Sequence, residues 1–310
     1  MATIDIREIP LAGPAAGPYG ITAGPDGALW LTLVHAGEIA RLGADGAVRT
    51  YPLDPAGGRP LIITTGPDDA LWFTRSGDDR IGRITVDGEQ RTIALPAGAG
   101  PGGIAAGPDG ALWYAGMTSD TIGRVDTDGT VTAFPLPVTG GFASMITTGA
   151  DDALWFTLNQ ANAIGRIDLD GGVTLHPLPT EKAGPVGLTL GGDGAIWFVE
   201  LAAGQLGRVD PDGGIVEFAL PNRSARPHAI VADPAGGAWF TEWGANRIGH
   251  IDPTGRIDGY DLPTPDAEPH GITLTPDGVW AALEIGAVAH LTAPTPPPPT
   301  APPTAPPTPL

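Results

Sequence analysis

Hydrophobic and polar positions repeat along the chain with a period of about 42 residues. In each of seven periods an apolar segment ends in a tryptophan, and successive tryptophans are 42, 41, 42, 42, 42 and 41 residues apart. The seven residues are Trp30, Trp72, Trp113, Trp155, Trp197, Trp239 and Trp280. A repeat of this length indicates an architecture in which each period forms one supersecondary unit.

Each period divides into short apolar segments separated by turn residues. In the third period, Gly-Pro-Asp-Gly at 107–110 precedes Trp113, and Ile-Gly-Arg-Val follows at 122–125. An Asp-Gly turn at 128–129 then leads into an alternating segment at 131–137 that ends in Leu-Pro. Pro-Asp-Gly suits a type I turn followed by a left-handed glycine, and Asp-Gly suits a hairpin. Each period therefore predicts four short strands.

Four strands in about 42 residues are typical of a β-propeller blade. The seven tryptophans predict an all-β, seven-bladed propeller and are expected to pack between blades. An α-helical solenoid would need an apolar period of about 3.6 residues, which the repeats lack.

The two ends of the repeat array are complementary. The seventh period stops after its third strand, at 290–292, whereas residues 4–11 resemble the fourth strand of the other periods. We expect the N-terminal strand to complete the last blade and leave no open sheet edge. The propeller is predicted to span residues 1–292. Residues 293–310 are almost entirely Pro, Thr and Ala and predict a disordered tail.

Composition narrows the functional classes. The chain has 47 glycines and 35 prolines, which suit many tight turns, and no cysteine, which excludes a disulfide framework. It lacks a long apolar segment, and its first residues lack the apolar core of a signal peptide, so we expect a cytoplasmic protein. The formal net charge of −19 disfavours nucleic acid and anionic membranes as partners. A closed propeller needs no second copy, so a monomer is expected.

A functional site is expected where the repeats differ from one another, because shared residues are explained by the fold. One such position begins the innermost strand of each blade. It holds, in chain order, Tyr19, Leu61, Gly102, Ser144, Val186, His228 and His270. Polar rings occupy blades six, seven and one, which are neighbours once the ring closes. This grouping indicates a site at the closure of the propeller.

Carboxylates accompany these rings. Glu268 lies two residues before His270, and Glu284 lies at the end of the second strand of the same blade. Glu242 and Trp243 occupy the corresponding turn of blade six. A histidine with two carboxylates can bind a metal or perform acid–base chemistry, and the oxygen-rich set favours Mg²⁺ over Zn²⁺. The alternative is an acidic rim without function.

The remaining polar candidates are interpreted as ordinary. The other four histidines are assigned to surface or packing positions: His35, His176, His250 and His290. Glu200, which is equivalent to Glu242, either borders the pocket or caps a turn.

Four motifs carry a resemblance to a known family. They are Gly-Pro-Tyr-Gly-Ile at 17–21, Ala-Arg-Pro-His-Ala-Ile at 225–230, Trp-Phe-Thr-Glu-Trp-Gly-Ala-Asn at 239–246 and Ala-Glu-Pro-His-Gly-Ile at 267–272. Together they resemble the virginiamycin B lyases, also called streptogramin B lyases, over about residues 3–292. The resemblance implies a Mg²⁺-dependent propeller enzyme that confers resistance by opening the lactone ring of streptogramin B depsipeptides through elimination.

The resemblance also implies a role for each candidate residue. His270 is expected to be the general base, and Glu268 and Glu284 the Mg²⁺ ligands. Substrate contacts are expected from three residues: His228, Tyr19 and Trp243. The chain departs from the family pattern where members often carry Glu or another polar residue, at Leu33, Arg75, Gly116 and Leu158. Those departures concern the far wall of the pocket.

Two other functions stay open at this point. A non-catalytic propeller could bind a peptide or other ligand at the same central face. A lactone-hydrolysing propeller would use a divalent metal and water, but such sites place several carboxylate and Asn ligands at the channel centre. Blades two to five offer none there, only Leu61, Gly102, Ser144 and Val186.

Overall fold

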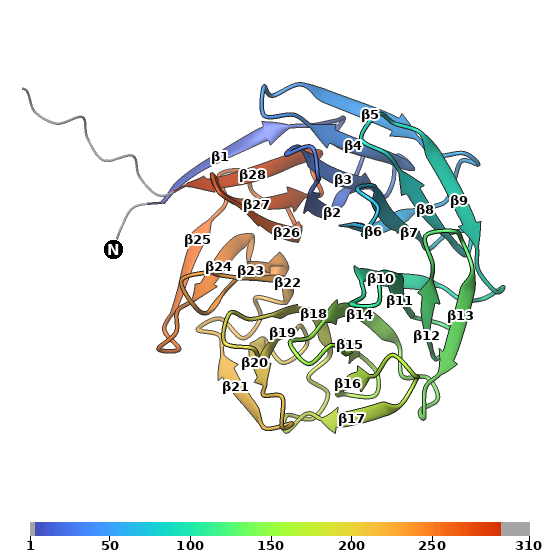
Figure 1. Ribbon diagram of the computed structural model, residues 1–310. Helices are drawn as coiled ribbons and strands as arrows, with labels where there is room; N and C mark the ends of the chain where they lie inside the picture. Colours follow the sequence, from blue (N-terminus) through green and yellow to red (C-terminus); the bar gives the residue numbers. More distant parts are fainter. Residues whose placement is uncertain (1–3, 293–310) are drawn as a thin grey trace, which may run out of the picture.

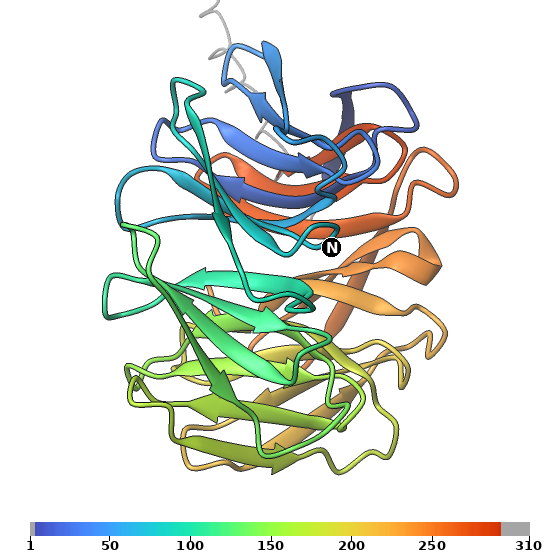
Figure 2. The ribbon, with the colours of Figure 1, turned by 90° about the vertical axis from the view of Figure 1, so that its right-hand side faces the viewer.

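The computed structural model describes residues 4–292, which form a ring of seven four-stranded antiparallel sheets. Figure 1 looks along the axis of the ring, and Figure 2 shows the same blades from the side. The all-β, seven-bladed propeller predicted from the repeat is confirmed. The predicted tail at 293–310 lies outside the described residues. Within the described part of the chain, no helix is long and apolar enough to cross a membrane.

The strands of blades one to six follow one another in the sequence from the axis to the rim, and β1 forms the outermost strand of blade seven. Blades one to three contain β2 (Pro18–Ala23), β3 (Leu29–Leu33), β4 (Glu38–Leu42), β5 (Val48–Pro52), β6 (Pro60–Thr65), β7 (Leu71–Arg75), β8 (Arg80–Ile84), β9 (Gln90–Ala94), β10 (Pro101–Ala106), β11 (Leu112–Gly116), β12 (Thr121–Val125) and β13 (Val131–Pro135). Blades four to six contain β14 (Ala143–Thr148), β15 (Leu154–Leu158), β16 (Ala163–Ile167), β17 (Val173–Pro177), β18 (Pro185–Leu190), β19 (Ile196–Glu200), β20 (Gln205–Val209), β21 (Ile215–Ala219), β22 (Pro227–Ala232), β23 (Ala238–Glu242), the 3₁₀ helix η1 (Trp243–Ala245), β24 (Arg247–Ile251) and β25 (Ile257–Asp261). Blade seven contains β26 (Pro269–Thr275), β27 (Gly278–Leu283), β28 (Ala287–Thr292) and β1 (Asp5–Pro10).

The N-terminal strand closes the ring as the sequence predicts. β1 pairs antiparallel with β28, from Asp5 opposite Thr292 to Pro10 opposite Ala287. The Glu8 carboxylate accepts hydrogen bonds from the backbone N–H and the hydroxyl of Thr264. In blade five, a carboxylate of β21 makes the same pair of hydrogen bonds to the loop after β17. β1 therefore serves as a true fourth strand of blade seven.

The repeated tryptophans pack between adjacent blades, as expected. Trp30 of blade one shares a hydrophobic cluster with Ile63 and Phe73 of blade two. Six of the seven tryptophans are buried, and Trp239 is partly buried. The indole N–H of Trp113 donates to Asp109 over 3.1 Å. The tryptophans therefore fill the spaces between sheets and also brace the turns that precede them.

The Asp and Arg of the repeat motifs support the tryptophan in blades one to four. Asp109 accepts from Trp113 with one oxygen and from Arg124 with the other, at 2.6 Å. Equivalent pairs join Trp to Asp and Asp to Arg in blades one, two and four. A residue with a Cβ at Gly123 would stand 2.0 Å from the Tyr114 ring, so only glycine fits between Ile122 and Arg124. In these four blades, the spacing of the two motifs thus follows from one hydrogen-bonded unit.

Each innermost strand contains an irregularity near the axis. In blade seven, Pro269 pairs with Leu283 and Ile272 pairs with Ala281, so β26 advances three residues while β27 advances two. This is a β-bulge, which redirects the side chains of the extra residues. The innermost strands of the other six blades, including neighbouring β2, show the same shift. The position that carries Tyr19, His228 and His270 lies in this bulge.

Candidate active site

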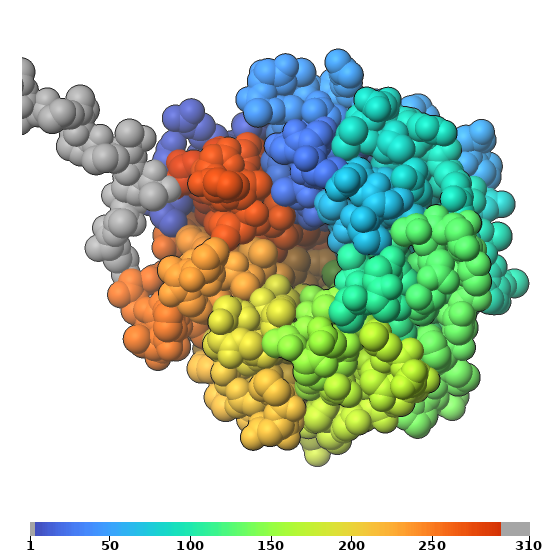
Figure 3. Space-filling model, in the orientation of Figure 1, coloured from blue at the N-terminus to red at the C-terminus, as the bar shows by residue number. Residues whose placement is uncertain are grey.

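A cavity of about 450 Å³ occupies the centre of the ring, and Figure 3 shows the hollow between the innermost strands. Blades two, four and five line it with Leu61, Met145 and Val186. Tyr19 and His228 line the side formed by blades one and six. The cavity therefore has an apolar wall that faces a polar one.

Tyr19, His228 and His270 form one aromatic cluster beside this cavity. The Tyr19 hydroxyl lies 3.1 Å from Nε2 of His228, and its ring stacks on that of His270 with centroids 4.5 Å apart. The ring of His228 meets the His270 ring edge-on at 5.0 Å. The prediction that the rings of blades six, seven and one meet is confirmed.

Burial keeps the two pocket-lining rings uncharged. The surrounding protein excludes water from His228, and this burial, with the neighbouring His270, lowers the pKa of His228 to about 3. Burial and then the negative charge of Glu284 raise the pKa of Tyr19 to about 12. At neutral pH the cluster therefore presents a neutral imidazole and a phenol, both able to share hydrogen bonds.

Glu268, His270 and Glu284 converge next to these rings. Each offers a potential ligand atom, and these atoms lie within 4.8 Å of one another. Nε2 of His270 is 2.5 Å from Oε2 of Glu284. The backbone N–H of Glu284 donates to the Glu268 carbonyl at 3.3 Å, which joins the two carboxylate-bearing turns. The structure thus brings together the acidic and histidine residues that the sequence singles out.

The charges in this group are set by burial and hydrogen bonding. Burial lowers the pKa of His270, although the hydrogen bond and charge of Glu284 oppose this effect. Burial alone would raise the pKa of Glu284, but the hydrogen bonds from His35 and His270 outweigh it and lower the pKa. Near neutral pH the pair is therefore an imidazole beside a carboxylate.

His35 is exposed, in agreement with its assignment to a surface or packing position, and it also contacts this group. Its Nε2 lies 2.8 Å from Oε1 of Glu284, across the seam between blades one and seven. The position of His35 in its repeat already places it near Glu284. Trp243 and Glu284 directly follow the second strand of their blades, and His35 lies one residue further along the equivalent turn of blade one. The other three histidines stack on Trp155, Trp239 and Trp280, as expected of packing residues.

The sequence model of the virginiamycin B lyase family matches residues 4–291. The chain belongs to the virginiamycin B lyase family.

Family members of known structure match this chain over nearly its whole length. A virginiamycin B lyase from Staphylococcus aureus has a TM-score of 0.91 and 40% sequence identity, covering 94% of this chain and 99% of its own. The same values describe a catalytically inactive histidine-to-alanine variant of virginiamycin B lyase from that organism, solved with quinupristin.

Curated relatives match over shorter segments. The virginiamycin B lyase of Saccharopolyspora erythraea is 63% identical over 49 residues, which is 16% of each chain. That of Mycobacterium sp. (strain KMS) is 67% identical over 43 residues, or 14% of each chain. The matched segments thus span less than a fifth of the length of these relatives.

Trp243 lies at the edge of the cluster rather than in the central cavity. It begins η1, and its ring centroid is 6.4 Å from that of His270. The Arg226 guanidinium lies over the indole at 5.3 Å, and the indole N–H is buried without a partner. Trp243, Arg226 and Glu268 line a second, open pocket beside the cluster. Trp243 and Glu268 therefore border the same pocket.

The residues that depart from the family pattern do not form the far wall of the cavity. The residues that end the second strands of blades one to six are fully or almost fully buried within the ring: Leu33, Arg75, Gly116, Leu158, Glu200 and Glu242. None of them lines the central cavity. The expectation that the four departing residues belong to the far wall of the pocket is therefore wrong. The β-bulge residues and the loops that follow β11, β13 and β15 form the wall instead.

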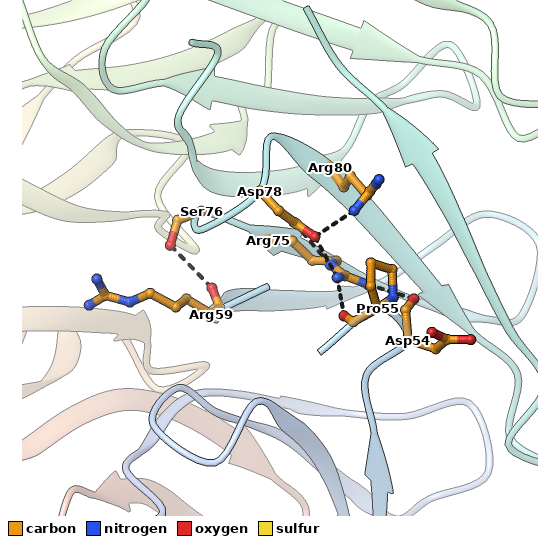
Figure 4. A network of polar contacts seen from close by, with 7 residues as sticks. All are labelled: Asp54, Pro55, Arg59, Arg75, Ser76, Asp78 and Arg80. Carbon is orange, nitrogen blue, oxygen red and sulfur yellow. Dashed lines mark hydrogen bonds and ion pairs between the residues drawn. The ribbon is translucent and has the colours of Figure 1, made fainter. Parts of the chain in front are cut away.

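Arg75 shows what such a buried position does. Its guanidinium donates to the carbonyls of Asp54 and Pro55 at 3.1 and 2.6 Å, and it pairs with Asp78 at 2.5 Å (Figure 4). Asp78 also accepts from Arg80 at 2.8 Å. These contacts fasten the linker between blades one and two to the end of β7. Arg75 therefore stabilises the loop rather than contacting a ligand.

A threonine under the site connects blades six and seven. The hydroxyl of Thr241 accepts from the backbone N–H of Ala229, in the β22 bulge, at 2.9 Å. It also donates to the carbonyl of His270 at 2.9 Å. The side chain is fully buried. This threonine of the Trp-Phe-Thr motif therefore ties the His228 bulge to the His270 backbone.

Proposed function

We propose that this protein is a lyase that linearises streptogramin B antibiotics, which are cyclic depsipeptides, and so confers resistance to them. The observation that carries the proposal is the Glu268, His270 and Glu284 group, which adjoins Tyr19 and His228 at one side of the central cavity. Membership of the virginiamycin B lyase family supports it. The quinupristin complex of the inactive histidine variant from S. aureus supports a cyclic depsipeptide substrate and an essential histidine.

The donor set suits Mg²⁺, which we propose as the cofactor. Glu268 and Glu284 would hold the cation, since Mg²⁺ prefers one or two carboxylates together with water or substrate oxygens. Their potential ligand atoms lie within 4.8 Å of each other. When bound, the cation would stabilise negative charge that develops on the substrate carbonyl and on the departing carboxylate.

His270 is the proposed general base. Because an ionised carboxylate can only accept hydrogen bonds, Nε2 of His270 carries the hydrogen when it contacts Glu284. The other ring nitrogen, Nδ1, is buried and without a partner. The ring can therefore accept a proton at Nε2 only after this hydrogen bond opens and the ring hydrogen resides on Nδ1. Burial, by lowering the pKa of His270, keeps the ring neutral for this task.

The reaction needs a base and no nucleophile. His270 would remove the Cα proton of the residue whose side-chain oxygen forms the ester. The Cα–H electron pair then forms a Cα=Cβ double bond, the Cβ–O bond breaks, and the ester leaves as a carboxylate. The product has the same mass as the substrate because no water is consumed. His228, Tyr19 and Trp243 are proposed to position the depsipeptide against this base.

The proposal is tested by incubating the protein and Mg²⁺ with quinupristin or virginiamycin S and determining the molecular mass of the product. We expect a ring-opened product of unchanged mass, and no turnover after the divalent cation is chelated. His270→Ala should abolish turnover and retain quinupristin binding, since it removes the base and keeps the cavity. His176→Gln is the matched control, because His176 stacks on Trp155 in the outermost strand of blade four.

Three outcomes would contradict the proposal. A product heavier by one water would indicate hydrolysis. Binding of quinupristin without any turnover would indicate a non-catalytic propeller. Full turnover by His270→Ala would exclude His270 as the base.

A further inference from the structure

The contact between His35 and Glu284 joins the first and last blades of the ring. The two residues are 249 positions apart in the sequence, and Nε2 of His35 lies 2.8 Å from Oε1 of Glu284. Their side chains are 48% and 32% exposed, so the contact lies at the mouth of the site and not in the core. Packing in the core does not account for a contact between two partly exposed side chains.

The fold holds the His35 ring in place. The backbone N–H of Val34 donates to the Gly17 carbonyl at 2.8 Å, and that of His35 donates to the Ala16 carbonyl at 3.1 Å. The ring lies over Gly17, where a Cβ would stand only 2.4 Å from its Cδ2. Gly17 also has a φ of +66°, which disfavours any larger residue. The segment that precedes Tyr19 therefore holds this imidazole in one position.

The direction of the hydrogen bond follows from the charge of Glu284. A glutamate of ordinary pKa is ionised near neutral pH, and its carboxylate can then only accept hydrogen bonds. Nε2 of His35 therefore donates to Oε1. Oε2 is left facing His270, on the side where Glu268 completes the group. The two imidazoles thus fix which carboxylate oxygen faces inward.

We propose that His35 is a positioning residue that orients the Glu284 carboxylate for the divalent cation. This inference rests on the proposed function, in which Glu268 and Glu284 hold that cation. A ligating carboxylate that is itself hydrogen-bonded binds metal with its orientation already set, and loss of such an outer partner typically costs about 10- to 100-fold in metal affinity or activity. The site would then require a residue from blade one as well as those from blade seven.

The experiment measures cation binding to the intact protein without substrate. Mn²⁺ serves as the probe, and the electron paramagnetic resonance signal of free Mn²⁺ gives its dissociation constant. His35→Asn shortens the side chain so that its N–H no longer reaches Glu284, whereas His35→Gln keeps an N–H donor at nearly the original distance. We expect His35→Asn to weaken Mn²⁺ binding by about 10-fold or more, and His35→Gln to stay within about 3-fold of the unmodified protein.

Turnover provides a second readout. If His35 orients the cation ligand, His35→Asn raises the Mg²⁺ concentration needed for half-maximal turnover, and excess Mg²⁺ restores most of the rate. Glu284→Gln serves as the positive control and should remove Mn²⁺ binding. Since His35 is half exposed, near-ultraviolet circular dichroism should be the same for both His35 variants.

The results separate this inference from the proposed function. Equal Mn²⁺ affinity in His35→Asn and the unmodified protein would overturn the positioning role alone. Equal weakening in the Asn and Gln variants would overturn it too, because a donor at the original distance should suffice. Failure of the unmodified protein to bind Mn²⁺ would overturn the cation site of the proposed function and the inference together.

Discussion

Glu200 is a carboxyl group that the fold places out of contact with water. It ends β19, is fully buried, and accepts a hydrogen bond from Gln205 at 2.6 Å with one oxygen. Its other oxygen has no partner. Burial first, and then the charge of Glu217, raise the pKa of Glu200 to about 7, against the opposing hydrogen bond from Gln205. The group therefore binds its proton more tightly in the folded protein than in the unfolded chain.

This difference predicts a pH dependence of stability. Below the unfolded pKa both states are protonated, and between that value and about 7 only the folded state holds the proton. The free energy of unfolding should therefore fall as pH rises through this range and level off above it. In Glu200→Gln, the decrease in the free energy of unfolding over this pH range should be smaller by about 1–3 kcal/mol. Urea unfolding at about pH 5.5 and about pH 8.5 measures it.

The control for this prediction is an exposed carboxylate. Glu89→Gln should leave the difference between the two pH values unchanged, because Glu89 is exposed. A Glu200→Gln protein with the same pH dependence as the unmodified one would show that Glu200 ionises normally in the fold.

At the level of single residues, the sequence identifies side chains by comparing blades. Tyr19, His228 and His270 stand out because equivalent positions in blades two to five are small or apolar. The same comparison overlooks His35, which lies one residue beyond the turn position of Glu284. It also leaves open whether Glu200 borders the pocket or caps a turn, whereas the structure buries Glu200 and Glu242 away from the central cavity. Side-chain direction at the end of a strand depends on packing, which the repeat pattern does not encode.

At the level of elements, the bulge of the innermost strand decides where the site residues point. Thr241 holds two of these bulges together through Ala229 and the His270 carbonyl. In Thr241→Val both hydrogen bonds are lost and two buried backbone groups lose a partner. We expect the free energy of unfolding to fall by about 1–3 kcal/mol and turnover to fall about 10-fold or more, because His270 would shift.

Thr74 offers a matched control for this substitution. It accepts from Ile62 N–H at 3.1 Å and donates to the Gly102 carbonyl at 2.7 Å, which repeats the Thr241 arrangement between blades two and three. Thr74→Val should destabilise the protein by a similar amount and leave turnover within about 3-fold of normal. Equal losses of turnover in the two variants, measured well below their unfolding temperatures, would show that Thr241 acts through stability alone.

The bulge itself could not be predicted from the sequence. The repeat gives strand number and order because turn residues and apolar alternation mark them. A bulge changes the register by a single residue, and the residues at 270–271 do not differ in kind from ordinary strand residues. Thr241 is visible in the sequence as part of Trp-Phe-Thr, but the carbonyl that it bonds belongs to the next blade. The repeat pattern therefore predicts the strands of each blade but not the contacts between blades.

At the level of the whole molecule, the seam between β1 and β28 is the only place where distant parts of the described chain share one sheet. Glu8 strengthens this seam by accepting hydrogen bonds from Thr264. Within the array, Glu217 accepts the equivalent hydrogen bonds from Thr180, at 3.0 and 2.7 Å. Glu8→Ala and Glu217→Ala should each lower the free energy of unfolding by about 1–2 kcal/mol. Only Glu8→Ala should increase amide hydrogen exchange in β1 and β28, which mass spectrometry can resolve by segment.

An equal increase of exchange across all blades in Glu8→Ala would contradict this prediction, since it would mean that the ring opens as a unit. The closure itself was predictable, because the missing fourth strand of blade seven and the extra strand at the N-terminus are both evident in the sequence. The hydrogen bonds that fasten it were not, because they connect residues 256 positions apart.

Ring closure also sets the time at which the site can exist during synthesis. Tyr19 and His35 emerge from the ribosome well before His270 and Glu284, and β1 must wait for β28. Blades can form one after another during translation, but the cluster can assemble only after residue 292 has been made. A truncated chain could therefore retain well-formed blades and still lack the whole cluster. Activity would then report on closure of the ring rather than on folding of the individual blades.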